Sequence, residues 1–311
     1  MSKDLLSKFR GVLLASSLGD AIGELAFKFR KKDELIEAIK RKKMFIYTDD
    51  TAMAIALAEY LLENEDINPE ELGKKFLLAY QKEPWRGYGP GPPRIFSLTK
   101  RGLSFKEAAT CIYPGGSFGN GAAMRVMPAA LYFWDSKDLY EKIKFVSFPT
   151  HTHPLAIDGA SVLAKAISFL LKKDKFALQD FFKNLKDIAK TSEFRKKLEV
   201  TEGLLTKNSS YYKAKQILKN NSTSLGSVPF SLFCFLKNKE NFVQGLIDSV
   251  SIAGDRDTIG CMAAGLWGAY LGIEGLPQEW LSRLENRGYI QRLADGLYDK
   301  KFKSVKQNRY K

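Results

Sequence analysis

Residues 47–62 read YTDDTAMAIALAEYLL and place two adjacent carboxylates, Asp49 and Asp50, at the start of an apolar segment. Thr48 and these aspartates are typical of a helix N-terminus, and the residues that follow carry apolar side chains at helical spacing. Residues 251–272, SIAGDRDTIGCMAAGLWGAYLG, repeat the arrangement: carboxylates, a threonine, and a helix pattern of small and apolar residues. The chain therefore contains the same acidic helix entrance twice, far apart in the sequence.

Helical periodicity dominates the rest of the chain, and alternating β-branched segments are nearly absent. Further helical patterns occupy residues 68–82, 153–173, 177–190, 227–238 and 241–253. Residues 83–102 and 113–126 are rich in glycine and proline, so we expect irregular structure there, and loops of that length are often functional. No linker composition or repeat is visible. We predict one all-α domain over residues 1–311, with a basic tail from about residue 299.

The composition is that of a globular protein: 311 residues, 45% of them hydrophobic. Lysine and arginine number 49 against 35 acidic residues, a formal net charge of +14. Such a charge favours anionic partners. The basic runs at residues 28–43 and 300–311 are better interpreted as solvated helix faces than as a nucleic-acid surface, because they match no known nucleic-acid-binding motif.

The expected location is the cytoplasm. Three widely spaced cysteines indicate neither a disulfide framework nor a zinc site, which favours a reducing compartment. The apolar N-terminal run is short and is followed at once by Asp20 and Glu24, unlike a secretory leader. No apolar run is long enough to span a bilayer, so no membrane partner is expected.

The two acidic entrances suggest a metal site. One capping residue is ordinary at a helix start, but Asp49 and Asp50 together are more than a cap requires. Asp255 and Asp257 precede Thr258 in the same way, and the small residues that follow would let two helices approach closely. Carboxylates gathered in one pocket would repel one another unless divalent cations neutralised them. Oxygen donors suit Mg²⁺, so a site for two ions, roughly 3.5–4 Å apart, is the simplest interpretation.

Two further segments could contact a ligand. In residues 115–126, GGSFGNGAAMRV, the glycines expose backbone N–H groups before a helix and could hold phosphate, although a plain turn explains them as well. Phe118 in this segment could stack on a base. His151 and His153 precede a helix, where they could cap it or fill space, and His151 could contact a ligand.

These motifs, in this order, resemble the ADP-ribosylglycohydrolase superfamily, also called the dinitrogenase-reductase-activating glycohydrolases. The resemblance rests on GVLLASSLGDAIG, YTDDTAM, GSFGNGAAMR, THTHPLAIDGA and GDRDTIGCMAAGLWGAYLG and covers residues 9–298. The segments YQKEPWRGYGPG and SVPFSLFCFLKN look most like the subgroup that removes ADP-ribose from serine and degrades poly(ADP-ribose). The resemblance implies an all-α, largely orthogonal helical bundle with a dimagnesium centre, where Mn²⁺ could replace Mg²⁺.

The resemblance also implies roles for individual residues. The metal ligands would be Thr48, Asp49, Asp50, Asp255, Asp257 and Thr258. ADP-ribose would contact Gly116, Ser117, Phe118, Gly119, Asn120, Gly121, Met124 and His151. The implied activity is Mg²⁺-dependent removal of ADP-ribose from a protein side chain, from poly(ADP-ribose) or from a small ester, with Asp49 or Asp50 positioning the water. The protein is expected to be a monomer.

Two positions differ from the family pattern. Phe27 stands where the family usually has a glutamate that binds metal and transfers a proton, and Glu24, earlier in the same segment, is the candidate replacement. Arg256 stands between Asp255 and Asp257, where the family has small residues. The alternative interpretation is therefore a protein that binds ADP-ribose or its polymer without cleaving it. A third, a basic nucleic-acid-binding protein, has only the net charge in its favour.

Overall fold

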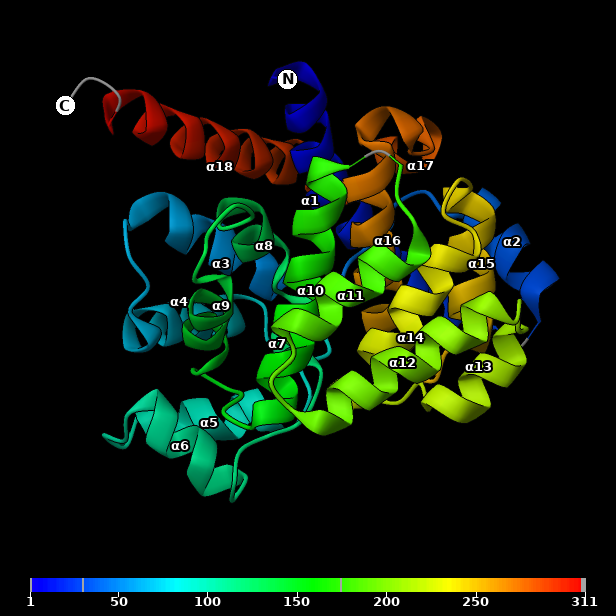
Figure 1. The fold of residues 1–311 in the computed structure, drawn as a ribbon. Coiled ribbons are helices and arrows are strands. Elements are labelled where there is room, and N and C mark those ends of the chain that lie inside the picture. The colour runs from blue at the N-terminus through cyan, green and yellow to red at the C-terminus, as the bar shows by residue number, and fades with distance from the viewer. Residues whose placement is uncertain (1, 30, 174, 309–311) are drawn as a thin grey trace.

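The computed structural model describes residues 2–29, 31–173 and 175–308. Within these ranges the chain forms eighteen α-helices, one 3-10 helix and no β-strand, which confirms the all-α prediction (Figure 1). The first half contains α1 (Ser2–Ala26), α2 (Lys32–Arg41), α3 (Asp49–Glu63), α4 (Pro69–Lys82), α5 (Gly91–Thr99), α6 (Phe105–Ile112), α7 (Gly121–Met124), α8 (Met127–Tyr132) and α9 (Leu139–Ser147). The second half contains α10 (Pro154–Lys172), α11 (Leu178–Ile188), α12 (Ser192–Thr206), α13 (Tyr211–Leu218), α14 (Ser224–Lys237), α15 (Phe242–Ile252), α16 (Arg256–Leu271), η1 (Ile273–Gly275), α17 (Gln278–Ser282) and α18 (Arg287–Asn308).

Helices α1 and α16 pack together through glycines. A methyl group added at Gly19 would lie 2.2 Å from the Gly260 carbonyl oxygen, and one added at Gly268 would lie 2.2 Å from the Gly11 carbonyl oxygen. The backbones are therefore in contact at both points, and only glycine fits. The contact continues to Gly23, where an added methyl would lie 2.2 Å from the Arg256 carbonyl oxygen. It brings the last turns of α1 beside the acidic entrance of α16.

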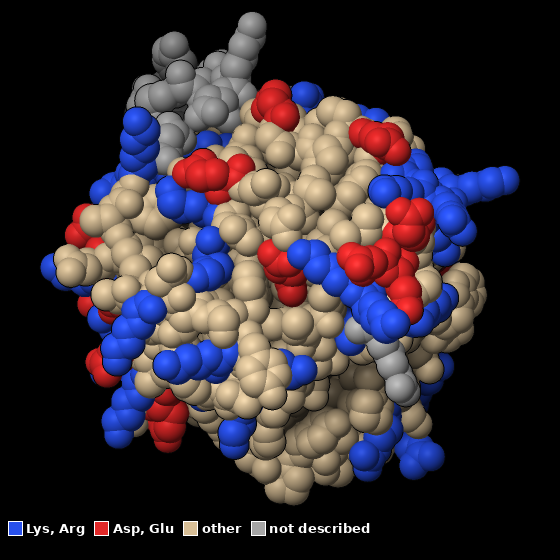
Figure 2. All heavy atoms as spheres, turned by 90° about the vertical axis from the view of Figure 1, so that its right-hand side faces the viewer, with Lys and Arg blue, Asp and Glu red and all other residues tan. Residues whose placement is uncertain are grey.

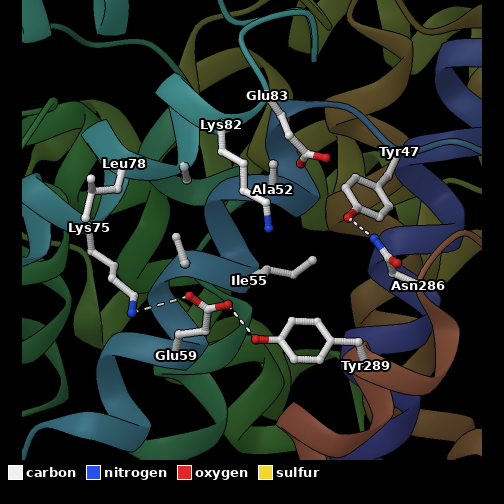
Figure 3. Close-up of a pocket in the computed structure, with 12 residues that line it drawn as sticks. Tyr47, Ala52, Ile55, Glu59, Lys75, Leu78, Lys82, Glu83, Asn286 and Tyr289 are labelled. Carbon is white, nitrogen blue, oxygen red and sulfur yellow. Dashed lines mark hydrogen bonds and ion pairs between the residues drawn. The ribbon is translucent and has the colours of Figure 1, made fainter.

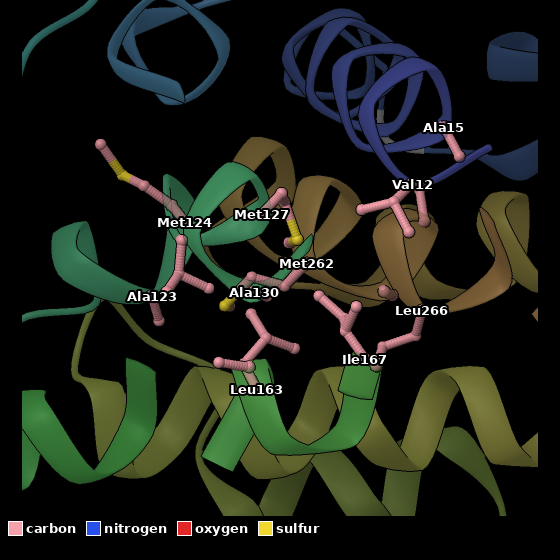
Figure 4. Close-up of a cluster of buried hydrophobic side chains, with 14 of the residues drawn as sticks. Val12, Ala15, Ala123, Met124, Met127, Ala130, Leu163, Ile167, Met262 and Leu266 are labelled. Atoms are coloured by element: carbon pink, nitrogen blue, oxygen red, sulfur yellow. The ribbon is translucent and has the colours of Figure 1, made fainter. Parts of the chain in front are cut away.

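The centre of the core lies where α1, α7, α8, α10 and α16 meet (Figure 4). Side chains such as Val12, Ile167 and Met262 are completely buried there, and Leu266 lies with them. Met124 belongs to the same buried cluster, but its sulfur points away from the other labelled side chains. The small residues of α1 and α16 leave room for these larger side chains, so the helices that carry the acidic turns are anchored in the core.

Helix α10 combines length with low polarity. The expectation that no apolar run is long enough to span a bilayer is wrong for this helix, which among the described residues is the one that could do so by length and composition. However, 83% of its apolar window is buried inside the protein. In Figure 1 it runs through the middle of the bundle. Its apolar surface is accounted for by packing against neighbouring helices.

The expectation that residues 83–102 are irregular is wrong in part, because α5 begins at Gly91 inside this segment. Its prolines occupy the first helical turn, where a missing N–H group costs no helical hydrogen bond. The same expectation for residues 113–126 is also wrong in part, because residues 113–120 are irregular but α7 (Gly121–Met124) forms inside the segment. The segment expected to be a basic tail from about residue 299 is helical as far as the structure describes it. Helix α18 continues to Asn308, and Lys300 Nζ donates to the carbonyl oxygens of Leu61 (2.9 Å) and Asn64 (2.7 Å) at the end of α3.

The basic residues do not gather on the face that carries α2, α13 and α15. Figure 2 shows lysine and arginine side chains interleaved with aspartate and glutamate over this face. Several lysines are paired, as in the ion pair between Lys32 and Asp248. This distribution agrees with the interpretation of the basic runs as solvated helix faces.

Candidate functional site

The first acidic turn is built on Asp20, a fully buried residue of α1. Its carboxylate accepts hydrogen bonds from the backbone N–H of Thr48 (3.0 Å) and Thr51 (3.1 Å) and from their hydroxyls (2.8 and 2.6 Å). One side chain of α1 thus fixes the N-terminal turn of α3. Burial raises the pKa of Asp20 to about 6, although these hydrogen bonds oppose the shift.

The sequence interpretation gave Asp20 no role. Asp20 appeared there as part of the GVLLASSLGDAIG motif and as a charge that ends the apolar N-terminal run, because an aspartate in the middle of an apolar helix carries no local sign of the turn that it holds. The available signal was the burial expected at that position of the helix. A charged residue on an apolar face needs partners, and the hydroxyls of the TDDT segment can supply them.

Asp49 and Asp50 are both buried at the start of α3. The backbone N–H of Asp49 donates to the Arg86 carbonyl oxygen (2.8 Å), which attaches this turn to the loop before α5. Burial, followed by the charge of Asp20, raises the pKa of Asp49 to about 7 and that of Asp50 well above its ordinary value. Asp50 Oδ2 is buried and has no hydrogen-bond partner among the described residues.

The second acidic turn faces the first. Asp255 accepts a hydrogen bond from Asn120 Nδ2 (2.7 Å), and Asp257 accepts one from the backbone N–H of Thr258 (2.9 Å). Burial and then the neighbouring Asp255 raise the pKa of Asp257 to about 8. The charge of Asp257 in turn contributes to the raised pKa of Asp50. The structure thus brings together the two acidic entrances that the sequence places far apart.

The chemistry of these donors fits a hard divalent cation. The facing groups are carboxyl groups and threonine hydroxyls, and Asp50 Oδ2 is a buried carboxyl oxygen without a hydrogen-bond partner among the described residues. Among the described residues, no three acidic, histidine or cysteine side chains are already arranged around one point as metal ligands. The site therefore suits a divalent cation because its donors are oxygens and because the buried carboxyls of Asp49, Asp50 and Asp257 would repel one another when ionised. It does not present a preformed coordination sphere.

A cavity of about 320 Å³ opens beside the acidic turns. Asp49, Asp50, Asp255, Asp257 and Thr258 form one wall. The opposite walls come from the two glycine-rich segments and from the residues before α10. Their lining residues are Gly87, Gly89, Pro90, Gly91, Pro92, Ile95, Tyr113, Ser117, Gly119, Asn120, Gly121, Met124, Thr150, His151 and Ser222. Six of the eight residues expected to contact ADP-ribose line this cavity.

The other two, Gly116 and Phe118, do not line it. Gly116 has a φ of +91°, and an added methyl would lie 2.4 Å from Thr152 Oγ1, so this glycine shapes the loop rather than a ligand contact. The Phe118 ring is half exposed and meets the His153 ring edge to face, with 5.8 Å between centroids. Asn120 N donates to the Ser222 carbonyl oxygen (3.0 Å), which fixes the loop to the segment before α14.

Arg125, Thr150 and His151 form a buried chain of hydrogen bonds under the cavity. Arg125 Nη2 donates to Thr150 Oγ1 (2.8 Å), which lies 2.7 Å from His151 Nδ1. Burial and then the charge of Arg125 lower the pKa of His151 to about 3, so the imidazole is neutral. The threonine hydroxyl can donate to Nδ1 or accept from it, so the tautomer decides whether Nε2 of the neutral His151 donates to a ligand or accepts from one. The sequence interpretation gave neither Arg125 nor Thr150 a role.

Glu24 lies on the other side of the acidic turns. It lines a separate cavity of about 280 Å³ together with Thr48 and Asp257, and it does not line the cavity of the glycine-rich loops. Phe27 lines neither cavity and is half exposed. Arg256 Nη1 donates to the carbonyl oxygens of Ala26 and of Phe29 (3.0 Å), and its guanidinium lies 6.0 Å from the Phe27 ring centre. The two departures from the family pattern are therefore neighbours at the end of α1.

A third cavity, of about 450 Å³, lies between α3, α4 and the start of α18 (Figure 3). Several of its polar groups are paired with one another. Glu59 accepts from Tyr289 and forms an ion pair with Lys75 (3.4 Å), and Asn286 Nδ2 donates to Tyr47 Oη (2.8 Å). None of the predicted site residues lines this cavity.

Comparisons with known proteins agree on one family. A model of the family described as ADP-ribosylglycohydrolase matches residues 1–306. The chain is 32% identical to ADP-ribosylhydrolase ARH3 of Xenopus tropicalis over 327 residues, covering 91% of this chain and 92% of the relative. It is 29% identical to human ADP-ribosylhydrolase ARH3, covering 94% of this chain and 93% of the relative.

A solved structure supports the fold independently. It is described as an ADP-ribosylglycohydrolase-related protein complex, superimposes with a TM-score of 0.76 and is 23% identical in sequence. The match covers 95% of this chain and 98% of that one. At this identity the likeness concerns the arrangement of the helices, which is the all-α bundle described above.

Proposed function

This chain belongs to the ADP-ribosylglycohydrolase family and is a glycosyl hydrolase by that membership, and from this premise we propose that it releases ADP-ribose from modified protein side chains with the help of divalent cations. The observation that carries the proposal is the wall shared by the acidic turns and the glycine-rich loop. Asn120 joins them through its hydrogen bond to Asp255, inside one cavity of about 320 Å³.

The loops are proposed to hold the nucleotide end of the substrate. Ser117 and the residues from Gly119 to Gly121 line the cavity, and backbone N–H groups in such a glycine-rich segment can donate to a diphosphate. The neutral His151 adds a hydrogen-bonding group, and Tyr113 provides an aromatic surface in the same cavity. These groups would place the distal ribose toward Asp49 and Asp50, on the acidic wall.

The acidic wall is proposed to carry the reaction. Thr48, Asp49 and Asp50 on one side, and Asp255, Asp257 and Thr258 on the other, would hold two Mg²⁺ ions, with Mn²⁺ as a substitute. Such ions neutralise the carboxylates and polarise the oxygens of substrate and water. In the reaction the bond between the ribose carbon and the side-chain heteroatom breaks, water supplies the new oxygen on that carbon, and a proton passes to the leaving heteroatom.

Two carboxylates are proposed to handle protons. Asp49 or Asp50 would orient the water and accept its proton, because both line the ribose side of the wall. Glu24 would donate the proton to the leaving heteroatom, because it lines the neighbouring cavity together with Asp257. Phe27 cannot transfer a proton, so Glu24 is the nearest candidate within its own segment. General acid–base groups typically contribute about 10²–10⁴ in rate.

The test is release of free ADP-ribose from serine-linked and arginine-linked substrates, with Mg²⁺ and with EDTA. Mg²⁺-dependent release from at least one linkage supports the proposal, and a large loss in Glu24→Gln assigns the proton transfer. No release from any substrate, combined with a melting temperature raised by ADP-ribose, would point instead to a protein that binds ADP-ribose without cleaving it.

A further inference from the structure

We propose that the second cavity, lined by Glu24 and Asp257, binds the polypeptide that carries the ADP-ribose, and that it favours acidic residues next to the modified side chain. The inference rests on the proposed function and adds to it a partner surface and a sequence preference. It concerns the cavity of about 280 Å³, which we call the acceptor cavity.

Continuity between the two cavities is the first argument. Gly87 and Asp257 line both of them, so the acidic turns separate two hollows that meet at these residues. If the first cavity holds ADP-ribose, the scissile bond lies at the acidic turns. The group on the far side of that bond must then lie toward Glu24. Gly87 has a φ of +88° and no atom within 4 Å of its missing side chain, so the backbone leaves this junction open.

Charge is the second argument. Lys28 and Lys42 line the acceptor cavity, and neither forms an ion pair with any residue that the structure describes. Lys28 is exposed and Lys42 is half-buried, so solvent reaches both residues. They belong to the basic run at residues 28–43, which the proposed activity does not otherwise use. Unpaired lysines at an open cavity favour carboxylates on the partner.

Exposed apolar surface is the third argument. Trp85 is 71% exposed and Ile46 is 51% exposed, although both are large apolar side chains. Both line the same cavity as the two lysines. Tryptophan is typical of the energetically important contacts in protein interfaces, and an apolar centre with charges around it suits a peptide segment.

A second ADP-ribose unit of a polymer fits less well. Recognition of a diphosphate favours a free guanidinium, which binds two oxygens at once. Arg86 is the only arginine lining the cavity within the described residues, and it is already occupied. Its guanidinium donates to Glu285 (2.7 and 3.0 Å), to Glu83 (3.0 and 3.2 Å) and to the Tyr47 carbonyl oxygen (3.0 Å).

The experiment compares three substrates with the linkage that the enzyme cleaves. One is a modified peptide with two glutamates beside the modified residue, the second has two lysines there, and the third is the ADP-ribosylated free amino acid. The test variants are Lys28→Glu with Lys42→Glu, and Trp85→Ala. The control is Lys137→Glu with Lys183→Glu, which reverses two exposed charges that line no cavity described here.

The wild type is expected to prefer the glutamate-flanked peptide. Its KM for this peptide should be lower than its KM for the lysine-flanked peptide. The double lysine variant should raise KM for the glutamate-flanked peptide about tenfold, because two attractive contacts become repulsive. Its kcat and its hydrolysis of the free amino acid conjugate should not change. The control should behave as the wild type, and 0.5 M salt should reduce the preference.

Equal KM values for the two peptides in the wild type would overturn the proposal. So would a loss confined to poly(ADP-ribose), which would assign the cavity to the polymer, or an equal loss on the free amino acid conjugate. If the wild type releases ADP-ribose from no substrate, the proposed function fails. In that case, the affinities of the two peptides, measured by calorimetry, still test this inference. Equal affinities overturn it. Tighter binding of the glutamate-flanked peptide that is lost in the double lysine variant supports it.

Discussion

The contact between α1 and α16 allows a quantitative test with Gly19→Ala. The added methyl would lie 2.2 Å from the Gly260 carbonyl oxygen and 2.5 Å from Ala264 Cβ, whereas ordinary contact begins at 3.4 Å. The helices must therefore separate by about 1 Å. Overpacking of this kind typically costs about 1–3 kcal/mol in the free energy of unfolding. Because Asp20 follows Gly19 directly, the carboxylate that holds the first acidic turn moves with the helix.

Two measurements follow from that displacement. The melting temperature should fall by a few degrees, since 1 kcal/mol corresponds to roughly 2–4 °C in chains of 150–250 residues. A displacement of 1 Å at reacting groups can cost about 10²-fold, so kcat should fall by that order. The KM should change little, because the loops that line the nucleotide end of the cavity belong to other helices.

Two further glycine variants separate the effects. Gly203→Ala makes the same substitution inside α12, where no atom lies within 4 Å of the new methyl, and it should raise stability by about 0.5–1 kcal/mol. Gly268→Ala disturbs the same helix contact two helical turns away from Asp20. It should lower the melting temperature as Gly19→Ala does, with a smaller loss of kcat. Wild-type melting temperature and kcat in Gly19→Ala would refute this account of the helix contact.

The remaining predictions concern the acidic wall and its neighbours. In EDTA, the free energy of unfolding should fall as pH rises from about 4 to 8. The raised pKa values of carboxyls such as Asp49 and Asp257 mean that folding takes up protons in this range. Denaturant titrations with and without Mg²⁺ should show a shallower fall when Mg²⁺ is present. Asp257→Asn should abolish Mg²⁺-dependent binding of ADP-ribose, measured by calorimetry, while its helical circular dichroism spectrum stays the same. An ADP-ribose affinity equal to that of the wild type would contradict the two-metal proposal. Glu24→Gln should lower kcat by about 10²–10⁴ and leave KM within a few-fold, and an unchanged kcat would exclude it as the proton donor. Arg256→Ala should speed hydrogen exchange of the Phe27 and Phe29 amides, because the guanidinium no longer binds the carbonyl oxygens at the end of α1, and equal exchange rates would contradict that role.

The helices were predictable because their apolar periodicity is strong. The patterns of α3, α4, α10 and α16 could be recognised in the sequence, and the repeated acidic entrance indicated which helix starts belong together. Proline misled the prediction at α5, because the rule that proline interrupts helices does not apply to the first turn. The small residues of α16 predicted a close helix contact, but its partner could not be known from that pattern alone.

The site was predictable only in part, and the missed residues share a physical reason. Asp20, Arg125 and Thr150 are buried polar residues whose partners position the site. Asp20 binds Thr48 and Thr51, and Arg125 binds Thr150, so these pairs join segments that lie more than 20 residues apart, and no local spacing reveals them. Phe118 shows the converse, because an aromatic residue among glycines suggested a base contact, yet in the structure its ring meets His153. Local patterns indicate which residues are chemically suited to a site, whereas packing decides which of them reach it.

The glycine contact between the first helix and α16 also constrains how the protein can be made. During synthesis at about 5–20 residues per second, roughly 12–50 s separate the end of α1 from the end of α16, taken from the 245 residues between Ala26 and Leu271. For that interval the apolar N-terminal helix lacks its glycine contact with α16, and the apolar surface that stays exposed promotes aggregation. We expect ribosome-bound chains that end before residue 256 to depend on chaperones and to be cleaved easily by proteases. Supplying the missing C-terminal fragment to such a chain should restore protease resistance.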